Sequence, residues 1–275
     1  MNDKSLVIKQ ILLDSNLNRL DTKLLLCHVL GFSRTQLITR DDYKLTRAQF
    51  ESYNLLYAKC LAGMPMAYIL GYKEFYSRIF KVNTNTLIPR PETELLVDTV
   101  LALAKPMAKV LDLGTGSGCI AISCKLEQQA LSVTATDKYP EALAIAISNA
   151  ADLGADIKFI NCDWLDGITD IYDIIVSNPP YIANNDKHLP ALSFEPQHAL
   201  TDFFDGMSAI RKIIEDSKAH LNGYLLIEHG YDQGSFTTEL MLKYGFRNIR
   251  TIRDYASLDR ITIGYSSNVD SHFAN

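Results

Sequence analysis

The chain has 275 residues, of which 47% are hydrophobic and 21% are charged, with a formal net charge of −5. This length suits one large domain or two ordinary ones, and the composition is typical of a soluble globular protein. It argues against a membrane-spanning protein, because no apolar run approaches the ~20 residues that a bilayer span needs. Residues 1–75 carry 10 Lys and Arg against 7 Asp and Glu, and the remainder carries 17 against 25.

The cysteines and the N-terminal segment indicate the compartment. The five cysteines are odd in number and contain no C-x-x-C pair, which argues against a disulfide framework or a zinc site. The first 16 residues hold acidic side chains among short apolar stretches and do not resemble a secretory signal. We therefore expect a cytoplasmic enzyme with no membrane partner.

The N-terminal segment, residues 1–70, is expected to form a small helical bundle, because its apolar residues recur at helical spacing. Asp21 is expected to cap a helix that ends at Gly31. Thr46 precedes a third helical run, which stops at Gly63. The segment has no cluster of His, Cys or acids at ligand spacing, so we expect it not to be the catalytic unit.

The pattern then changes to alternation typical of an α/β fold. Aromatic and β-branched residues alternate over Tyr72–Val82, which predicts a hairpin, and a helix is expected to start near Glu92. Repeated βα units beyond it predict a parallel sheet with helices on both faces, whose ligands bind at the carboxyl ends of the strands. The expected strands are Val110–Leu113, Val133–Thr136, Ile157–Ile160, Ile174–Val176 and Tyr224–Glu228, and the expected helices are Gly118–Leu126, Pro140–Asn149 and Ala209–Ala219.

A glycine-rich turn follows the first strand of this region. "VLDLGTGSG" places three glycines directly before a helix, where the backbone turns tightly and a ligand approaches a helix N-terminus. Nucleotide, flavin and sulfonium cofactors all use such turns. The dinucleotide pattern matches only in a relaxed form from Gly116 to Ala121, so this turn alone leaves NAD open.

Acidic residues at three successive strands indicate which of these cofactors the site binds. Asp137 ends the second strand, where a carboxylate can accept hydrogen bonds from ribose hydroxyls. Asp163 and Trp164 follow the third strand, where they can bind an amine and stack on a purine; the alternative is a turn cap and a core aromatic. Together with Asp112, these acids suit the cationic S-adenosyl-L-methionine better than a pyrophosphate, which needs positive charge.

The fourth strand ends in Asn178, Pro179, Pro180 and Tyr181. A planar amide or aryl amine is a poor nucleophile, and two acceptors, the Asn178 side chain and the Pro179 carbonyl, can each take one of its N–H groups. Its lone pair is then aimed at a sulfonium carbon, which is catalysis by orientation without a charged base. Tyr181 can pack on the flat group. A simple Pro-Pro turn that closes the strand is the alternative.

The motifs together resemble the protein-(glutamine-N5) methyltransferases that act on peptide-chain release factors, the PrmC/HemK family. The resemblance rests on NPPY with "LDLGTGSGCIAI", "LIPRPETELLVD", "EFYSRIFKV" and "EPQHAL", and it covers nearly the whole chain. It implies a Rossmann-like class I methyltransferase sheet with a small N-terminal helical domain. The implied domains are a substrate-docking domain at 1–70, a β-hairpin linker at 71–88 and an S-adenosylmethionine-dependent domain at 89–275.

The resemblance also implies roles for individual residues. The substrate is the glutamine of the Gly-Gly-Gln tripeptide in class I release factors, methylated by a monomeric enzyme that binds no nucleic acid stably. The sequence departs from the family at Lys138-Tyr139-Pro140 and at Phe203-Phe204. The expected catalytic and substrate-binding residues are Asn178, Pro179, Pro180 and Tyr181, and the expected cofactor-binding residues are Asp112, Gly114, Thr115, Gly116, Ser117, Gly118, Asp137, Asp163, Trp164 and Asn178.

Two other functions use parts of the same pattern. An adenine-N6 methyltransferase has the same NPPY geometry but needs a basic channel, whereas residues 76–275 carry a net charge of −8 (17 − 25). A non-catalytic adaptor that keeps the fold would tolerate loss of the glycine turn or of the Asn. This sequence retains both. His28, His188, His198, His220 and His229 lack ligand spacing and are interpreted as core or surface residues.

Overall fold

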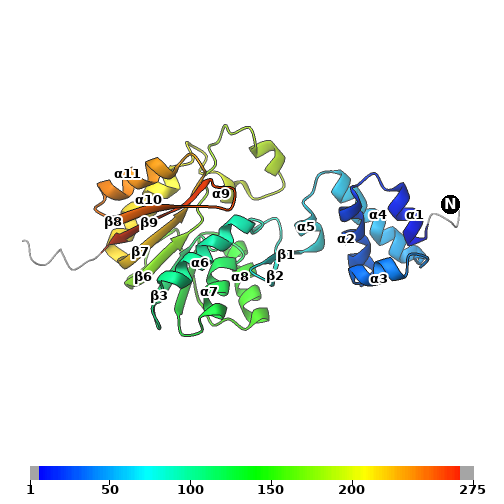
Figure 1. Cartoon of the computed structure of the whole chain (residues 1–275), viewed down its shortest axis with the longest axis horizontal. Coiled ribbons are helices and arrows are strands. Elements are labelled where there is room, and N and C mark those ends of the chain that lie inside the picture. Colours follow the sequence, from blue (N-terminus) through cyan, green and yellow to red (C-terminus); the bar gives the residue numbers. More distant parts are fainter. Residues whose placement is uncertain (1–5, 267–275) are drawn as a thin grey trace, which may run out of the picture. The chain divides into compact units, whose positions relative to one another are not determined.

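The computed structural model describes residues 6–266. The chain forms two compact units, Met1–Tyr72 and Lys73–Asn275. Figure 1 labels their helices and strands along the chain. Among residues 6–266, none of the helices has both the length and the apolar character that crossing a bilayer requires.

The first unit is helical, as predicted. Thr46 caps the helix that follows it, and its hydroxyl accepts a hydrogen bond from the backbone N–H of Gln49. The predicted cap at Asp21 is wrong: the side chain of Asn18 is the cap, and it accepts from the backbone N–H of Asp21, which lies in the first turn. Within residues 6–72 the α-helices are α1 (Ile8–Asp14), α2 (Arg19–Leu30), α3 (Arg34–Thr39), α4 (Arg47–Leu61) and α5 (Met66–Leu70).

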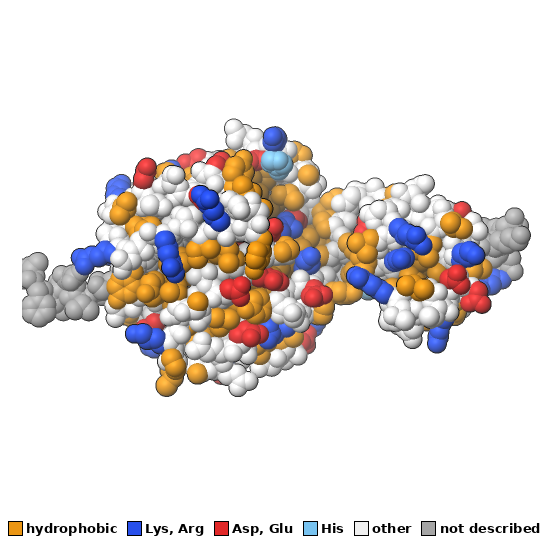
Figure 2. Space-filling model, in the orientation of Figure 1, with side chains coloured by type: hydrophobic (Ala, Val, Ile, Leu, Met, Phe, Trp, Pro, Cys, Tyr) orange, Lys and Arg blue, Asp and Glu red, His pale blue; other side chains and the backbone are white. Residues whose placement is uncertain are grey.

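The helical unit has its own core and a surface that carries basic side chains. Leu25 and Leu26 of α2 are fully buried, and Tyr53 of α4 is almost so, because the apolar residues recur on one face of each helix. Figure 2 shows several Lys and Arg side chains over its visible face. Exposed basic residues in the described part of this unit are Lys9, Arg19, Arg34, Arg40, Lys44, Arg47 and Lys59.

The second unit contains the predicted hairpin and a seven-stranded sheet of order β5-β4-β3-β6-β7-β9-β8. The hairpin is β1 (Tyr72–Phe75) and β2 (Arg78–Lys81); the sheet strands are β3 (Lys109–Leu113), β4 (Ser132–Asp137), β5 (Lys158–Asn161), β6 (Tyr172–Ser177), β7 (Leu221–Glu228), β8 (Arg247–Arg253) and β9 (Asp259–Ser266). The helices are η2 (Pro91–Thr93), α6 (Glu94–Leu103), α7 (Cys119–Glu127), α8 (Pro140–Leu153), η3 (Leu189–Leu192), α9 (Gln197–Leu200), α10 (Ser208–His220) and α11 (Gly234–Lys243).

Two apolar cores lie on opposite faces of the sheet, because successive side chains of a strand point to opposite sides. Val110 and Ile174 pack with α6 and α7 on one face. Leu111 and Ile175 pack with α10 and α11 on the other. Figure 1 shows these helices covering both faces. The five parallel strands, β3 to β7, match the predicted strands, whereas β8 and β9 are antiparallel additions at one edge that we did not predict.

The parallel register brings the predicted motifs to one edge of the sheet. Leu113, before the glycine turn, pairs with Thr136 on one side and Ser177 on the other. Asp137 and Asn178 directly follow these two partners. The glycine turn therefore lies between Asp137 and the Asn-Pro-Pro-Tyr segment, at the carboxyl ends of the strands.

Candidate active site

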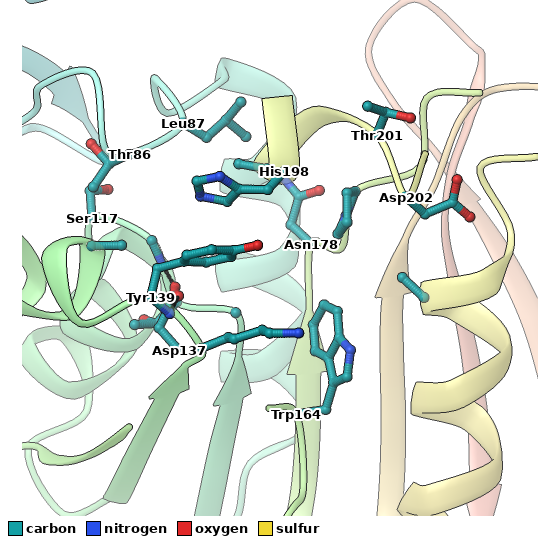
Figure 3. A pocket seen from close by; sticks show the side chains of 18 of the residues that line it. Thr86, Leu87, Ser117, Asp137, Tyr139, Trp164, Asn178, His198, Thr201 and Asp202 are labelled. Carbon is teal, nitrogen blue, oxygen red and sulfur yellow. Dashed lines mark hydrogen bonds between the residues drawn. The ribbon is translucent and has the colours of Figure 1, made fainter. Parts of the chain in front are cut away.

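A cavity of about 430 Å³ opens at this edge of the sheet, within the second unit (Figure 3). Its size falls in the range of small-molecule and cofactor sites. The cavity also borders η2 through Thr93 and the segment that carries α9 through His198. The predicted site residues that line it are Gly114, Thr115, Gly116, Ser117, Asp137, Asp163, Trp164, Asn178 and Pro180.

Asp112 was expected to contact the cofactor, but it is fully buried and does not line the cavity. Its Oδ2 accepts hydrogen bonds from the Thr115 hydroxyl at 2.6 Å and from the backbone N–H of Ala121 at 3.3 Å. Burial raises the pKa of this carboxyl to about 7. Asp112 thus holds the glycine turn onto α7. Gly118 is the N-cap of that helix and is also absent from the lining.

Asp137 lines the cavity and organises the turn beside it. One carboxylate oxygen accepts from the backbone N–H of Gly116 at 2.9 Å, and the other accepts from that of Tyr139 at 2.9 Å. Burial raises the pKa of the Asp137 carboxyl, and these two hydrogen bonds oppose the shift. Each oxygen has a second lone pair, so the carboxylate can still accept from two neighbouring hydroxyls.

Asp163 and Trp164 lie at the cavity as expected, with an unexpected neighbour. The Asp163 carboxylate forms an ion pair with the Lys138 ammonium at 2.9 Å, which belongs to the segment that departs from the family. Trp164 has a positive φ of 54° and packs partly on the core of the α10 face. Both residues line the cavity, and Figure 3 shows the Trp164 side chain there, so a turn cap and a core aromatic do not fully describe them.

The Asn-Pro-Pro-Tyr segment divides between the cavity and the structure behind it. Asn178 and Pro180 line the cavity, whereas Pro179 is buried. Asn178 Nδ2 donates to the Thr93 hydroxyl at 3.2 Å. Tyr181 does not line the cavity: its ring packs on the α10-side core, and its hydroxyl lies near the Arg260 guanidinium. Burial raises the pKa of the Tyr181 phenol.

Sequence reasoning missed two features of the cavity. His198 was interpreted as a core or surface residue, but it lines the cavity and stacks on Tyr139, with ring centroids 3.6 Å apart (Figure 3). Burial lowers the pKa of this imidazole. Thr93 was not singled out. Both residues lie in motifs already noted, His198 in "EPQHAL" and Thr93 in "LIPRPETELLVD", so motif membership was the available signal.

The Phe203-Phe204 departure lies at the mouth of the cavity. Phe203 has a positive φ of 63° and lines the cavity, while Phe204 is 74% exposed. The loop is well ordered by Asp202, whose carboxylate accepts from the backbone N–H groups of Phe204, Gly206 and Ser208. The departure therefore changes the cavity rim and leaves the glycine turn untouched.

Comparison with known proteins identifies the family. Residues 8–71 match the PrmC N-terminal domain, and residues 91–193 match the methyltransferase small domain. A release factor glutamine methyltransferase of Neisseria gonorrhoeae is 46% identical over 259 residues, covering 91% of this chain and 94% of that protein. One of Bordetella pertussis is 43% identical, covering 94% and 99%. The chain belongs to the release factor glutamine methyltransferase family.

The fold comparison agrees with this assignment. A methyltransferase from Pyrococcus furiosus superimposes with a TM-score of 0.55 at 17% identity, over 79% of this chain and 98% of that one. The likeness supports the Rossmann-like class I sheet, which was predicted from the motifs. The resemblance to the release factor glutamine methyltransferases is confirmed, and membership in this family implies S-adenosyl-L-methionine as the methyl donor.

Proposed function

We propose that the protein transfers a methyl group from S-adenosyl-L-methionine to the side-chain amide nitrogen of the glutamine in the Gly-Gly-Gln motif of class I release factors. The observation that carries the proposal is the placement of the Asn178 side chain in the same cavity as the glycine turn and Asp137. A relative with 46% identity over nearly the full length supports the substrate class, since its name gives a release factor glutamine.

The cavity fits the proposed donor in size and chemistry. It offers the Asp137 carboxylate for ribose hydroxyls and the flat face of Trp164 for a purine, while Asp163 is paired with Lys138. We assign the cofactor to Gly114, Thr115, Gly116, Ser117, Asp137, Asp163, Trp164 and Asn178. Asp112 and Gly118 support this set from behind.

The chain's own residues orient the substrate nitrogen. An amide nitrogen is a weak nucleophile because its lone pair is delocalised into the carbonyl. The Asn178 side-chain oxygen and the Pro179 carbonyl oxygen accept its two N–H groups, which directs the lone pair along one line. When bound, S-adenosylmethionine supplies an electrophilic methyl group on a sulfonium. Pro180 closes the cavity wall, and Tyr181 holds the segment in place through Arg260.

We further propose that the helical unit docks the protein substrate and that the enzyme is a cytoplasmic monomer without a stable nucleic-acid partner. The domains assigned are 1–70 for docking, 71–88 for the hairpin linker and 89–275 for methyl transfer. The acidic catalytic segment supports this assignment, because a nucleic-acid channel requires basic side chains.

The test incubates the protein with S-adenosylmethionine carrying a labelled methyl group. One sample contains a class I release factor and a second contains adenine-bearing DNA, and mass spectrometry locates the label. We expect the label on the glutamine of Gly-Gly-Gln and none on DNA. Label on adenine with none on the glutamine would replace the proposal with the adenine-N6 reaction.

A further inference from the structure

A buried carboxylate lies directly behind the side chain that is proposed to orient the substrate. Glu228 is the last residue of β7 and is 1% exposed. Strands β6 and β7 are parallel neighbours in which Ser177 pairs with Ile227, so Asn178 and Glu228 follow partnered positions. One oxygen of the Glu228 carboxylate, Oε2, has no hydrogen-bond partner within the described chain. The mechanism above gives this carboxylate no role.

Thr93 connects the two residues. Its hydroxyl accepts a hydrogen bond from Asn178 Nδ2 at 3.2 Å. The side chains of Thr93 and Asn178 also lie close enough to the Glu228 carboxylate to favour its anionic form. Because the Thr93 hydroxyl accepts from Asn178, its single proton is free for another acceptor, and an ionised Glu228 carboxylate can only accept. The direction that fits this geometry runs from Asn178 to Thr93 and from Thr93 toward Glu228.

This direction determines which end of the Asn178 amide faces the cavity. The NH₂ group of Asn178 donates to Thr93, and the carbonyl oxygen is therefore the end left for the substrate. The proposed reaction needs that arrangement, because the substrate nitrogen presents N–H groups and requires an acceptor. If the Asn178 amide were reversed, its NH₂ group would face the N–H groups of the substrate, and neither could accept a hydrogen bond.

We propose that ionised Glu228, acting through Thr93, is the positioning residue that keeps the Asn178 carbonyl oxygen turned toward the substrate amide. The inference rests on the proposed function and deepens it. Neither residue is a catalytic residue in this role, since Glu228 lies outside the cavity lining and Thr93 acts through Asn178.

Protonation of Glu228 would remove the directionality. A neutral carboxyl can donate to Thr93, whose hydroxyl then donates to the Asn178 oxygen and favours the reversed amide. The charged and titratable groups around Glu228 are Arg260, which favours the anion, and Glu92, Tyr181 and Cys119, whose anionic forms oppose it. Burial raises the pKa of Glu228 to about 7. The reactive form is thus lost as pH falls through about 7.

The test uses single-turnover methylation of the release factor from pH 5.5 to 9, with binding of S-adenosylmethionine followed by the fluorescence of Trp164, the single tryptophan. Thr93→Val keeps the shape but removes the hydroxyl, and we expect a rate about 10²-fold lower with cofactor affinity within about threefold. Thr93→Ser restores the hydroxyl and should recover most of the rate. In Glu228→Gln, the loss of rate below pH 7 should disappear and the rate should be low throughout.

Two comparisons separate positioning from a general structural effect. The double variant Thr93→Val/Asn178→Ala should be no slower than Asn178→Ala alone, because both changes remove the same interaction. Glu127→Gln removes an acid from an ion pair with Arg78 and should keep the wild-type pH profile. Wild-type rates in Thr93→Val, or losses that multiply in the double variant, would overturn the inference. A wild-type protein that fails to methylate the release factor would instead refute the proposed function.

Discussion

At the residue scale, Asn178 carries the largest expected effect on the reaction. Asn178→Ala removes an acceptor that acts on the reacting nitrogen, so we expect kcat to fall by about 10²–10³-fold. The dissociation constant of S-adenosylmethionine should stay within about threefold, because most of the assigned cofactor residues are unchanged. Asn222→Ala, an exposed position on β7, is the matched control and should keep wild-type kcat. Near-wild-type turnover of Asn178→Ala would rule out the orientation mechanism.

Gly114 tests how closely the turn approaches Trp164. Its φ is +69°, and a Cβ there would lie 3.2 Å from Trp164 Cζ3. Gly154 at the end of α8 has a φ of +74°, and a Cβ added there would have no atom within 4 Å. Both Ala variants should lose about 1 kcal/mol of unfolding free energy, because left-handed backbone disfavours a side chain. Only Gly114→Ala should also shift Trp164 fluorescence and weaken S-adenosylmethionine binding, measured by titration; equal cofactor affinities would contradict the contact.

At the element scale, Asn149 joins three segments. This residue of α8 is 1% exposed; its amide oxygen accepts from the Lys81 N–H at 2.8 Å, and its NH₂ donates to the carbonyls of Lys81 and Ser117. It thereby links the hairpin to the glycine turn. Asn149→Ala leaves these buried groups unpaired and should lower the free energy of unfolding by roughly 3 kcal/mol.

The neighbouring Ser148 provides the control for that helix. Its hydroxyl accepts only an exposed hydrogen bond from the Lys81 ammonium, so Ser148→Ala should change unfolding by less than about 0.5 kcal/mol. Denaturant unfolding followed through Trp164 measures both variants. Asn149→Ala should also bind S-adenosylmethionine more weakly, since Ser117 lines the cavity. A stability equal to that of Ser148→Ala would show that the link is unimportant.

At the scale of the whole molecule, buried acids make stability depend on pH. Burial raises the pKa of Asp112 to about 7, so the folded chain binds this proton more tightly than the unfolded chain. The contribution of Asp112 to the free energy of unfolding therefore falls as pH rises from about 4 to about 7, and it then stays level. Asp112→Asn cannot ionise, so its stability relative to wild type should improve between pH 5 and pH 8, measured by denaturant unfolding.

Asp202 is the control with the opposite sign. Hydrogen bonds from Ser208 and the surrounding backbone lower the pKa of this carboxyl. The stabilisation that ionised Asp202 gives is present above its unfolded pKa and is lost only in more acidic solution. Asp202→Asn should therefore lower the free energy of unfolding by the same amount at pH 5 and pH 8. A pH-independent difference between wild type and Asp112→Asn would contradict the buried-acid account.

The two-unit organisation predicts separable binding functions. Removing residues 1–72 should leave S-adenosylmethionine affinity within about threefold, because every cavity residue lies in the second unit, and this affinity also reports that the fragment folds. The value of kcat/KM on the release factor should fall by at least about tenfold, since docking contacts worth about 1.4 kcal/mol or more are lost. A short Gly-Gly-Gln peptide should react equally with both proteins. An undiminished kcat/KM on the release factor would refute docking by the helical unit.

The sequence by itself determined the parallel strands, the glycine turn and the placement of Asn178 at a strand end. These features follow from local causes: side chains alternate along a strand, glycine permits a tight turn, and consecutive prolines end a ladder. The antiparallel β8 and β9 were missed. Their residues carry no motif, and pairing at a sheet edge depends on the strand already there.

The tertiary structure alone decided which of the predicted residues reach the cavity. Asp112 and Asp137 are both acidic residues of strands that precede turns. In the folded protein Asp112 is fully buried and bonds the glycine turn, whereas Asp137 lines the cavity. Thr93 and Asn178 are 85 positions apart, and they meet because η2 leads into α6, which packs against β6 and β7. Sequence order does not encode sheet order, so the chain from Asn178 through Thr93 to Glu228 exists only in the folded protein.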